Sequence, residues 1–247
     1  MTASSIPPFL SVIIPTLNES AHIDDVLQDL SHGDATEVIV ADGGSRDTTI
    51  EQAAAHNVRI CQGLAGRARQ MNQGAALARG TILFFLHADS RLPAGFDRVI
   101  RRTLDAAHVA AGAFSLGIDA DYGKMRMVAY WANLRSRYLG MPYGDQGLFL
   151  KAVRFHQCGG FPELPIMEDF AMMQRLRKTG RIVTVRERLY TSPRRWRRLG
   201  VLRTTLTNQA IIAGYLLGVP ADRLSRWYRQ SRRLDRPHSP CRTGDDA

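Results

Sequence analysis

The sequence predicts an α/β protein with a mostly parallel central sheet, helices on both faces of that sheet and a helical extension at the C-terminal end. Two observations lead to this class. Short apolar runs alternate with segments of helical spacing through the first half of the chain, as in repeated β-α-β units. These runs are continuous rather than interrupted by polar residues, which is typical of parallel strands covered on both faces.

The elements of the first half can be placed in order along the chain. The run FLSVIIPT lies between two prolines and Asn-Glu-Ser, EVIVADGG runs into a glycine turn, and TILFFLHAD is apolar until its last residues. The segments between these runs carry helical spacing, and the helix after TILFFLHAD has a proline near its start. We therefore expect strands over residues 9–16, 37–44, 58–63 and 81–89, and helices over residues 23–30, 45–55, 66–78 and 93–107.

The second half of the chain is less regular. We expect a loop at residues 161–165, strands over 112–119 and 181–185 and within 143–152, and helices over 122–139, 168–179 and 193–217, the last interrupted at Gly214. These elements suggest a main α/β domain over residues 8–190 and a helical extension over residues 191–233. The Pro-, Ser- and Asp-rich residues 234–247 are predicted to be a disordered tail.

Composition and charge restrict the class of protein. Hydrophobic residues make up 45% and charged residues 23% of the chain, which is ordinary for a folded globular protein. The longest late apolar stretch, residues 210–219, is too short to span a bilayer, which needs about 20 residues. The cysteines (Cys61, Cys158 and Cys241) are widely spaced, so we expect reduced thiols and a cytoplasmic protein.

The net charge of +10 is concentrated late in the chain, where arginines cluster in residues 186–203 and 223–236. Such clusters favour phosphates, nucleic acid or anionic lipid, although a solvated basic face is an equal alternative. Residues 193–236 also carry apolar and aromatic side chains, so this segment could lie peripherally on the inner face of the cell membrane. The alternative is that its apolar positions pack on the main domain. The sequence gives no reason to expect an obligate protein partner.

Polar segments follow three of the predicted strands, at residues 16–19, 42–47 and 87–89. Ligands of parallel sheets bind beyond the carboxyl ends of the strands, so these segments are expected at one site. Asp42 could accept a hydrogen bond from a base N–H, and the glycines after it would allow a flat ligand to approach. An ordinary turn, with Asp47 near the start of the next helix, is the alternative.

Two further groups of carboxylates suggest metal binding and proton transfer. Asp89 could hold Mg²⁺ or Mn²⁺ together with the oxygens of a diphosphate, with His87 as a second ligand, unless this is only a polar strand end. Glu168 and Asp169 open a predicted helix, where the helix dipole favours carboxylates as caps. Because adjacent helical positions point in different directions, only one of the two is expected to face a pocket, where an ionised carboxylate can act as a base.

Longer motifs connect these residues. In order, the chain contains SVIIPTLNE, VADGGSRDTT, GRARQMNQGAALARGTILFFLHAD, YGDQGLFLKAVRFHQCGGF and MEDFAMMQRLRKTG. Together they resemble the inverting family 2 glycosyltransferases of the GT-A fold, a Rossmann-like fold of nucleotide-diphospho-sugar transferases, from Leu10 to Thr184. GRARQMN, FLHAD and GDQG resemble a bacterial subgroup, some members of which are linked to arsenosugar biosynthesis while others are labelled carotenoid (diaponeurosporenoate) glycosyltransferases.

The resemblance implies a transferase that uses a nucleotide-sugar donor, expected to be a UDP-sugar, and an acceptor that bears a hydroxyl group. The acceptor would be a lipid, a carotenoid or a small metabolite. Asp169 would be the general base, with Glu168 beside it, and a divalent metal would bind Asp89 and His87. The family often has Asp-x-Asp at this point, so the first carboxylate is absent here. The donor nucleotide would contact Pro15, Glu19, Asp42, Gly43, Arg67, Asn72, Ala88 and Asp89, and the acceptor and diphosphate side would include Gly144, Asp145, Gln146, Gly160, Arg195 and Trp196.

Two other functions are compatible with parts of the sequence. A nucleotidyltransferase on a related α/β scaffold would need a glycine-rich basic loop after the first strand, where this chain has PTLNES. A non-enzymatic binder of nucleic acid would explain the arginine clusters. It would leave the carboxylates at the strand ends unexplained, because they repel phosphate unless a metal intervenes. Nucleic acid is therefore not expected as a partner.

Overall fold

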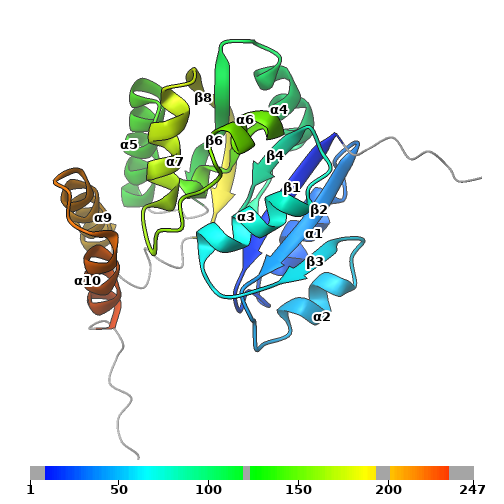
Figure 1. Cartoon of the computed structure of the whole chain (residues 1–247), viewed down its shortest axis with the longest axis horizontal. Coiled ribbons are helices and arrows are strands. Elements are labelled where there is room, and N and C mark those ends of the chain that lie inside the picture. Colours follow the sequence, from blue (N-terminus) through cyan, green and yellow to red (C-terminus); the bar gives the residue numbers. More distant parts are fainter. Residues whose placement is uncertain (1–8, 119–122, 193–200, 234–247) are drawn as a thin grey trace, which may run out of the picture. The chain divides into compact units, whose positions relative to one another are not determined.

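A computed structural model describes residues 9–118, 123–192 and 201–233 (Figure 1). The chain divides into two compact units, Met1–Pro193 and Arg194–Ala247. The predicted boundary between residues 190 and 191 lies close to this division. The predicted tail at 234–247 is outside the described residues, as are Arg195 and Trp196.

The first half of the sheet is parallel, as its continuous apolar runs predict. The strands lie in the order β3-β2-β1-β4, and every pairing among them is parallel. The chain therefore turns back after β3, and α3 lies in this crossover and packs against β1 and β2 (Figure 1). The elements are β1 (Leu10–Thr16), α1 (Ile23–Leu30), β2 (Thr36–Asp42), α2 (Thr49–Ala54), β3 (Arg59–Gln62), α3 (Arg67–Leu77) and β4 (Ile82–Phe85).

The second half extends the same sheet beyond β4. The order continues β4-β7-β6-β8-β5, with β4–β7, β6–β7 and β5–β8 antiparallel and β6–β8 parallel. Among the strands of the described residues, four pairings are parallel and three are antiparallel. These elements are β5 (Ser90–Arg91), α4 (Phe96–Leu104), β6 (Val109–Ile118), α5 (Gly123–Leu139), the 3₁₀ turn η1 (Gly144–Gln146), β7 (Leu148–Lys151), α6 (Ala152–Gln157), α7 (Glu168–Arg177) and β8 (Arg181–Thr191).

Helices cover both faces of the sheet, and β4 shows why its sequence is apolar throughout. Phe84 points to one face, where its ring centroid lies 6.3 Å from that of Phe96 on α4 and 5.8 Å from that of Phe114 on β6. Phe85 points to the opposite face, where its ring centroid lies 5.1 Å from that of Phe155 on α6 and 4.9 Å from that of Phe161. Neighbouring residues of a strand thus bury opposite faces of the sheet.

Some predicted boundaries are wrong for local reasons. The helix predicted from residue 45 begins at Thr49, because the Asp47 carboxylate accepts hydrogen bonds from the Thr49 N–H and hydroxyl and the residues before it form a turn. The strand predicted to residue 89 ends at Phe85, so His87 and Asp89 lie in the following loop. The strand predicted over residues 181–185 continues to Thr191, because β6 pairs with it along its length. The short helix α6 was not predicted.

The described part of the second unit, residues 201–233, contains the helices α9 (Val201–Leu216) and α10 (Ala221–Arg233), which pack against one another. Gly214 does not interrupt α9. A Cβ at this position would lie 2.8 Å from Leu224 Cδ2, so the glycine permits close approach of α10. None of the helices within the described ranges is long and apolar enough to cross a membrane.

Candidate active site

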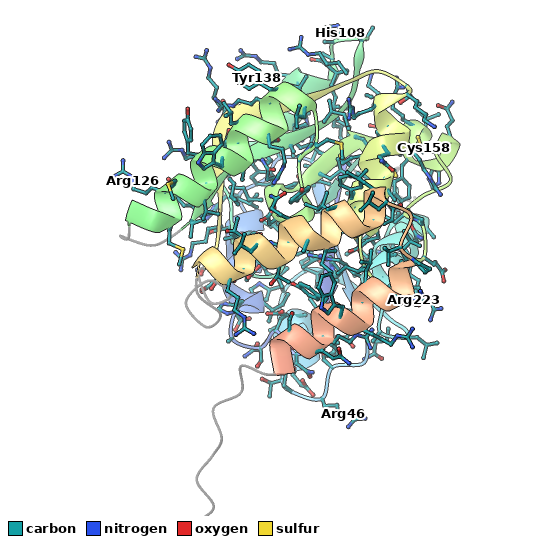
Figure 2. All side chains as sticks on the ribbon, turned by 90° about the vertical axis from the view of Figure 1, so that its left-hand side faces the viewer. Arg46, His108, Arg126, Tyr138, Cys158 and Arg223 are labelled. Carbon is teal, nitrogen blue, oxygen red and sulfur yellow. The ribbon has the colours of Figure 1, made fainter. Side chains whose placement is uncertain are left out.

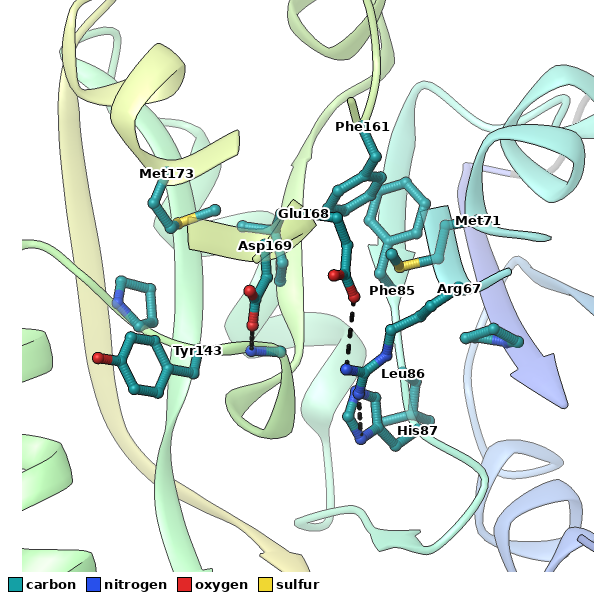
Figure 3. A pocket seen from close by; sticks show the side chains of 14 residues that line it. Arg67, Met71, Phe85, Leu86, His87, Tyr143, Phe161, Glu168, Asp169 and Met173 are labelled. Atoms are coloured by element: carbon teal, nitrogen blue, oxygen red, sulfur yellow. Dashed lines mark hydrogen bonds and ion pairs between the residues drawn. The ribbon is translucent and has the colours of Figure 1, made fainter. Parts of the chain in front are cut away.

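A pocket lies where β1 and β4 end, in the first unit (Figure 3). The connection after β1 runs to one side of the sheet and the connection after β4 runs to the other side. In open α/β sheets, ligands usually bind where two neighbouring strands have such diverging connections. Six of the predicted site residues line this pocket: Pro15 at the end of β1, Arg67 at the start of α3, His87 after β4, Gly144 in η1, and Glu168 and Asp169 at the start of α7.

Arg67 connects two of the predicted residues. Its Nη1 lies 3.5 Å from Glu168 Oε1, and its Nη2 contacts both ring nitrogens of His87, with 3.2 Å to Nδ1 (Figure 3). A guanidinium only donates, so it can bond to only one nitrogen of a neutral His87, and the tautomer decides which nitrogen accepts. The Arg67 side chain remains 44% exposed, so its positive charge is available to a ligand in the pocket.

Glu168 is the most buried charged group of the pocket. Met167, with a φ of 70°, turns the chain into α7, and the Glu168 side chain then points to Arg67 (Figure 3). Burial raises the pKa of the Glu168 carboxyl, and the negative charge of Asp169 raises it further, while Arg67 acts in the opposite direction. Glu168 is therefore placed to hold the guanidinium of Arg67.

Asp169 is held in a different way. Its Oδ2 accepts a hydrogen bond from the Gly144 N–H at 2.9 Å, and its Oδ1 accepts one from the Phe170 N–H at 2.7 Å. The expectation that only one of the two carboxylates faces a pocket is wrong, because both line it. The pocket lies beside the first turn of α7, so the side chains of Glu168 and Asp169 can both reach it although they point in different directions (Figure 3).

Gly144 is tightly enclosed by the other pocket residues. A Cβ here would lie 3.2 Å from His87 Nε2 and 3.3 Å from Asp169 Oδ2. The fully buried Gln146 supports this turn from behind, since its Nε2 donates to the Phe114 carbonyl at 3.0 Å and to Ser136 Oγ at 3.2 Å. Gln146 thus shapes the loop without lining the pocket, and Asp145 lies in the same turn.

The predicted donor residues around β2 are used by the fold itself. The buried Asp42 carboxylate accepts hydrogen bonds from the Gly44 N–H (2.8 Å), the Ser45 N–H (2.9 Å) and the Ser45 hydroxyl (2.5 Å). A Cβ on Gly43 would lie 3.1 Å from Ala65 Cα, so the close approach at this glycine is made by the chain itself. Glu19 lies in the turn after β1, where its N–H donates to Thr49 Oγ1 at 2.9 Å. These three predicted residues lie outside the pocket lining.

Asn72 and Gly160 form a structural pair next to the pocket. The Asn72 side chain donates to the Phe161 carbonyl and accepts from the Phe161 N–H, both at 2.9 Å. Gly160 has a φ of 68°, and a Cβ there would lie 2.8 Å from Asn72 Oδ1. The pair holds the Phe161 backbone beside α3, and Phe161 itself lines the pocket.

The metal prediction is only partly compatible with the geometry. In the described parts of the chain, no group of three or more His, Cys, Asp and Glu side chains is arranged to hold a metal. Asp89 is half-buried in the loop after β4, next to the buried Ala88, and offers the oxygen ligand that Mg²⁺ and Mn²⁺ prefer. Both ring nitrogens of His87 meet the Arg67 guanidinium, so a metal ion bound by His87 would compete with this contact.

The sequence interpretation missed the remaining walls of the pocket. Tyr143 stands directly before the GDQG motif, and its ring lies 3.4 Å below the Arg135 guanidinium, measured from the ring centroid. Burial raises the pKa of its phenol. The position of Tyr143 next to the GDQG motif could have identified it as a pocket residue. No sequence feature could have identified the apolar wall of the pocket, because its residues come from four separate segments: Met71, Phe85, Phe161 and Met173.

Comparison with solved structures defines the fold. The chain resembles S. aureus TarS 1-349 in complex with UDP with a TM-score of 0.62 and 18% identity, over 78% of this chain and 63% of that one. It resembles the mannosyltransferase PcManGT from Pyrobaculum calidifontis, in complex with GDP-Man and Mn²⁺, with a TM-score of 0.62 and 20% identity, over 84% of this chain and 65% of that one. The GT-A fold that the motifs implied is confirmed.

Comparison of sequences defines the family. The chain is 37% identical to the PGL/p-HBAD biosynthesis glycosyltransferase of Mycobacterium tuberculosis in an alignment over 95 residues that covers 34% of this chain. The match spans only 37% of the length of that relative. The model of glycosyl transferase family 2 matches residues 11–160, which include β1 to β4 and most of the predicted site. The chain therefore belongs to glycosyl transferase family 2.

Proposed function

We propose that this family 2 member transfers a glycosyl group from a nucleotide-sugar donor, a UDP-sugar, to an acceptor hydroxyl with inversion. The observation that carries the proposal is the meeting of Arg67, Glu168 and Asp169 in one pocket at the ends of β1 and β4. A cation for a diphosphate and a carboxylate for a hydroxyl proton are the two groups that such a transfer needs. The UDP bound to the structurally similar TarS favours UDP as the nucleotide.

The proposed reaction is a single displacement. The Asp169 carboxylate, positioned by two backbone N–H groups, accepts the proton of the acceptor hydroxyl while that oxygen attacks the anomeric carbon. The bond between this carbon and the diphosphate oxygen breaks, and the nucleoside diphosphate leaves with its electron pair. Arg67, oriented by Glu168 and His87, stabilises the negative charge that develops on it. The configuration inverts because no enzyme nucleophile takes part.

A divalent ion is part of the proposal. Asp89 would hold Mg²⁺ or Mn²⁺ together with diphosphate oxygens, and the bound ion would supply positive charge to the leaving group. The Mn²⁺ in the PcManGT complex supports this expectation. A cytoplasmic location, membrane association through residues 193–236 and an arsenosugar-like, carotenoid or lipid acceptor stay hypotheses. Family membership favours a transferase over a nucleotidyltransferase or a binder of nucleic acid.

Thermal unfolding with a panel of nucleotide sugars tests the donor and the metal together. UDP-sugar with Mn²⁺ should stabilise the fold, by about 2.7 kcal/mol at a hundredfold excess over the dissociation constant, and a chelator should remove most of the gain. Asp89→Ala should lose the metal-dependent part, whereas Asp105→Ala, at an exposed aspartate after α4, should behave like the parent. Equal UDP–metal binding by Asp89→Ala would refute the metal assignment. No response to any nucleotide sugar would refute the donor class.

A further inference from the structure

The helix α5 carries a stripe of large apolar side chains on its outer side. Its other side is buried against the sheet, where Ser136 is inaccessible and Asn133 exchanges two hydrogen bonds with the Leu116 backbone. The exposed residues recur at helical spacing, so they share one face. Their exposed fractions run from 56% for Met127 to 80% for Tyr138, and this apolar stripe consists of Met127, Tyr130, Trp131, Tyr138 and Leu139.

The charge of α5 is of one sign only. Residues 123–139 contain four basic residues (Lys124, Arg126, Arg135 and Arg137) and no Asp or Glu. Arg126 and Arg137 are exposed, and helical geometry places both on the same edge of the stripe. Figure 2 shows Arg126 and Tyr138 projecting outward from α5. The surface is therefore apolar and aromatic along its centre and cationic along one edge.

We propose that α5 docks flat on an anionic membrane surface through this apolar stripe. Tyr and Trp side chains combine an apolar ring with a polar tip, which suits the boundary between acyl chains and headgroups. The flanking arginines would meet anionic headgroups, and the charge of +10 over the whole chain favours the same surface. A second copy is a poor occupant, because two α5 helices would bring like charges together without acidic residues between them.

The position of α5 gives the docking a consequence for the pocket. The chain passes from Leu139 directly into the loop that holds Tyr143 and Gly144, and Arg135 of α5 stacks on Tyr143. A docked α5 would hold this side of the pocket close to the bilayer. Binding to vesicles does not require the proposed glycosyl transfer, so the two proposals can fail separately.

Co-sedimentation of the full chain with vesicles of phosphatidylcholine, with and without phosphatidylglycerol, tests the surface. The parent should bind the anionic vesicles. The triple variant Tyr130→Ser/Trp131→Ser/Tyr138→Ser should partition at least about tenfold more weakly, because its interfacial side chains are lost. Arg126→Gln should lose about fivefold, and high salt should abolish this difference. A matched control, Leu64→Ser/Val153→Ser, removes side chains that are 72% and 61% exposed on other elements and should bind like the parent.

Tryptophan fluorescence locates the contact. With Trp196→Phe and Trp227→Phe, Trp131 is the remaining tryptophan, and its emission should shift to the blue on anionic vesicles. Three results would overturn the proposal: no sedimentation of the parent at low salt, parent-like sedimentation of the triple variant, or an unchanged Trp131 emission. A triple variant that changes only the oligomeric state would assign α5 to a second copy. UDP binding, measured on the triple variant and on Arg126→Gln, should stay at the parent's level, and its absence in the parent would refute only the proposed donor.

Discussion

Replacing Glu168 by glutamine should preserve stability at neutral pH while weakening activity. Glu168 is only 5% exposed, and burial raises the pKa of its carboxyl above the ordinary value of 4.5 although Arg67 opposes the shift. Burial therefore outweighs the ion pair, whose Nη1–Oε1 distance is 3.5 Å and whose arginine is half-exposed. Glutamine keeps the shape and can still accept a hydrogen bond from Arg67, but it removes the buried charge.

The magnitude follows from these two opposing terms. An ion pair with a half-exposed arginine adds about 0–1 kcal/mol to the free energy of unfolding. At pH values above the raised pKa, every unit by which burial raises a carboxyl pKa lowers the free energy of unfolding by about 1.4 kcal/mol. We expect the free energy of unfolding of Glu168→Gln at neutral pH to equal the parent's or exceed it by about 1 kcal/mol. The Glu168 carboxyl binds its proton more tightly in the folded parent than in the unfolded chain. The stability of the parent relative to the variant should therefore fall as the pH rises from 4.5 through the raised pKa, and then stay constant.

Urea unfolding of both proteins, from about pH 5 to about pH 8, measures this difference. Glu163→Gln is the matched control, because Glu163 also pairs with an α3 arginine, Arg69, at 2.9 Å, but with both side chains about half exposed. The control should change neither the pH dependence nor the activity. Glu168→Gln should lower kcat/KM by about tenfold, because Arg67 loses its charged anchor. A loss of more than about 1 kcal/mol at neutral pH, or a difference that is constant with pH, would refute the reasoning.

Two further predictions concern Asp169 and Gly144, whose N–H donates a hydrogen bond to the Asp169 carboxylate. Asp169→Asn should lower single-turnover transfer by about 10²–10⁴-fold with donor binding retained, and a larger loss in Glu168→Gln would transfer the role of base to Glu168. Gly144→Ala places a Cβ 3.2 Å from His87 Nε2 and 3.3 Å from Asp169 Oδ2, so these side chains must move. Transfer should fall by about 10- to 100-fold while the free energy of unfolding changes by less than about 1 kcal/mol, and parent-like kinetics would contradict this.

Local patterns predicted the parallel half of the sheet and the chemistry at its edge. β1, β2 and β4 could be read from the sequence because a strand covered on both faces needs apolar side chains at every position, as Phe84 and Phe85 illustrate. The position of Arg67 at the start of α3 and the carboxylates that open α7 were also available locally. What each polar residue contacts was not available. For Asp42 the sequence allows both a contact with a base and an ordinary turn, and the structure shows its oxygens accepting the hydrogen bonds of its own turn.

The tertiary structure decided which distant side chains meet. Arg67 and Glu168 are 101 positions apart, and no spacing rule connects them. Their contact requires β7 to pair antiparallel with β4 and α7 to begin at the edge where β1 ends. The same arrangement brings both carboxylates of α7 to one pocket and turns His87 toward Arg67. A sequence shows which faces of its helices and strands must be buried. Which of these faces pack against one another depends on the whole unit, because each pair of elements that packs together limits the surfaces left for the remaining elements.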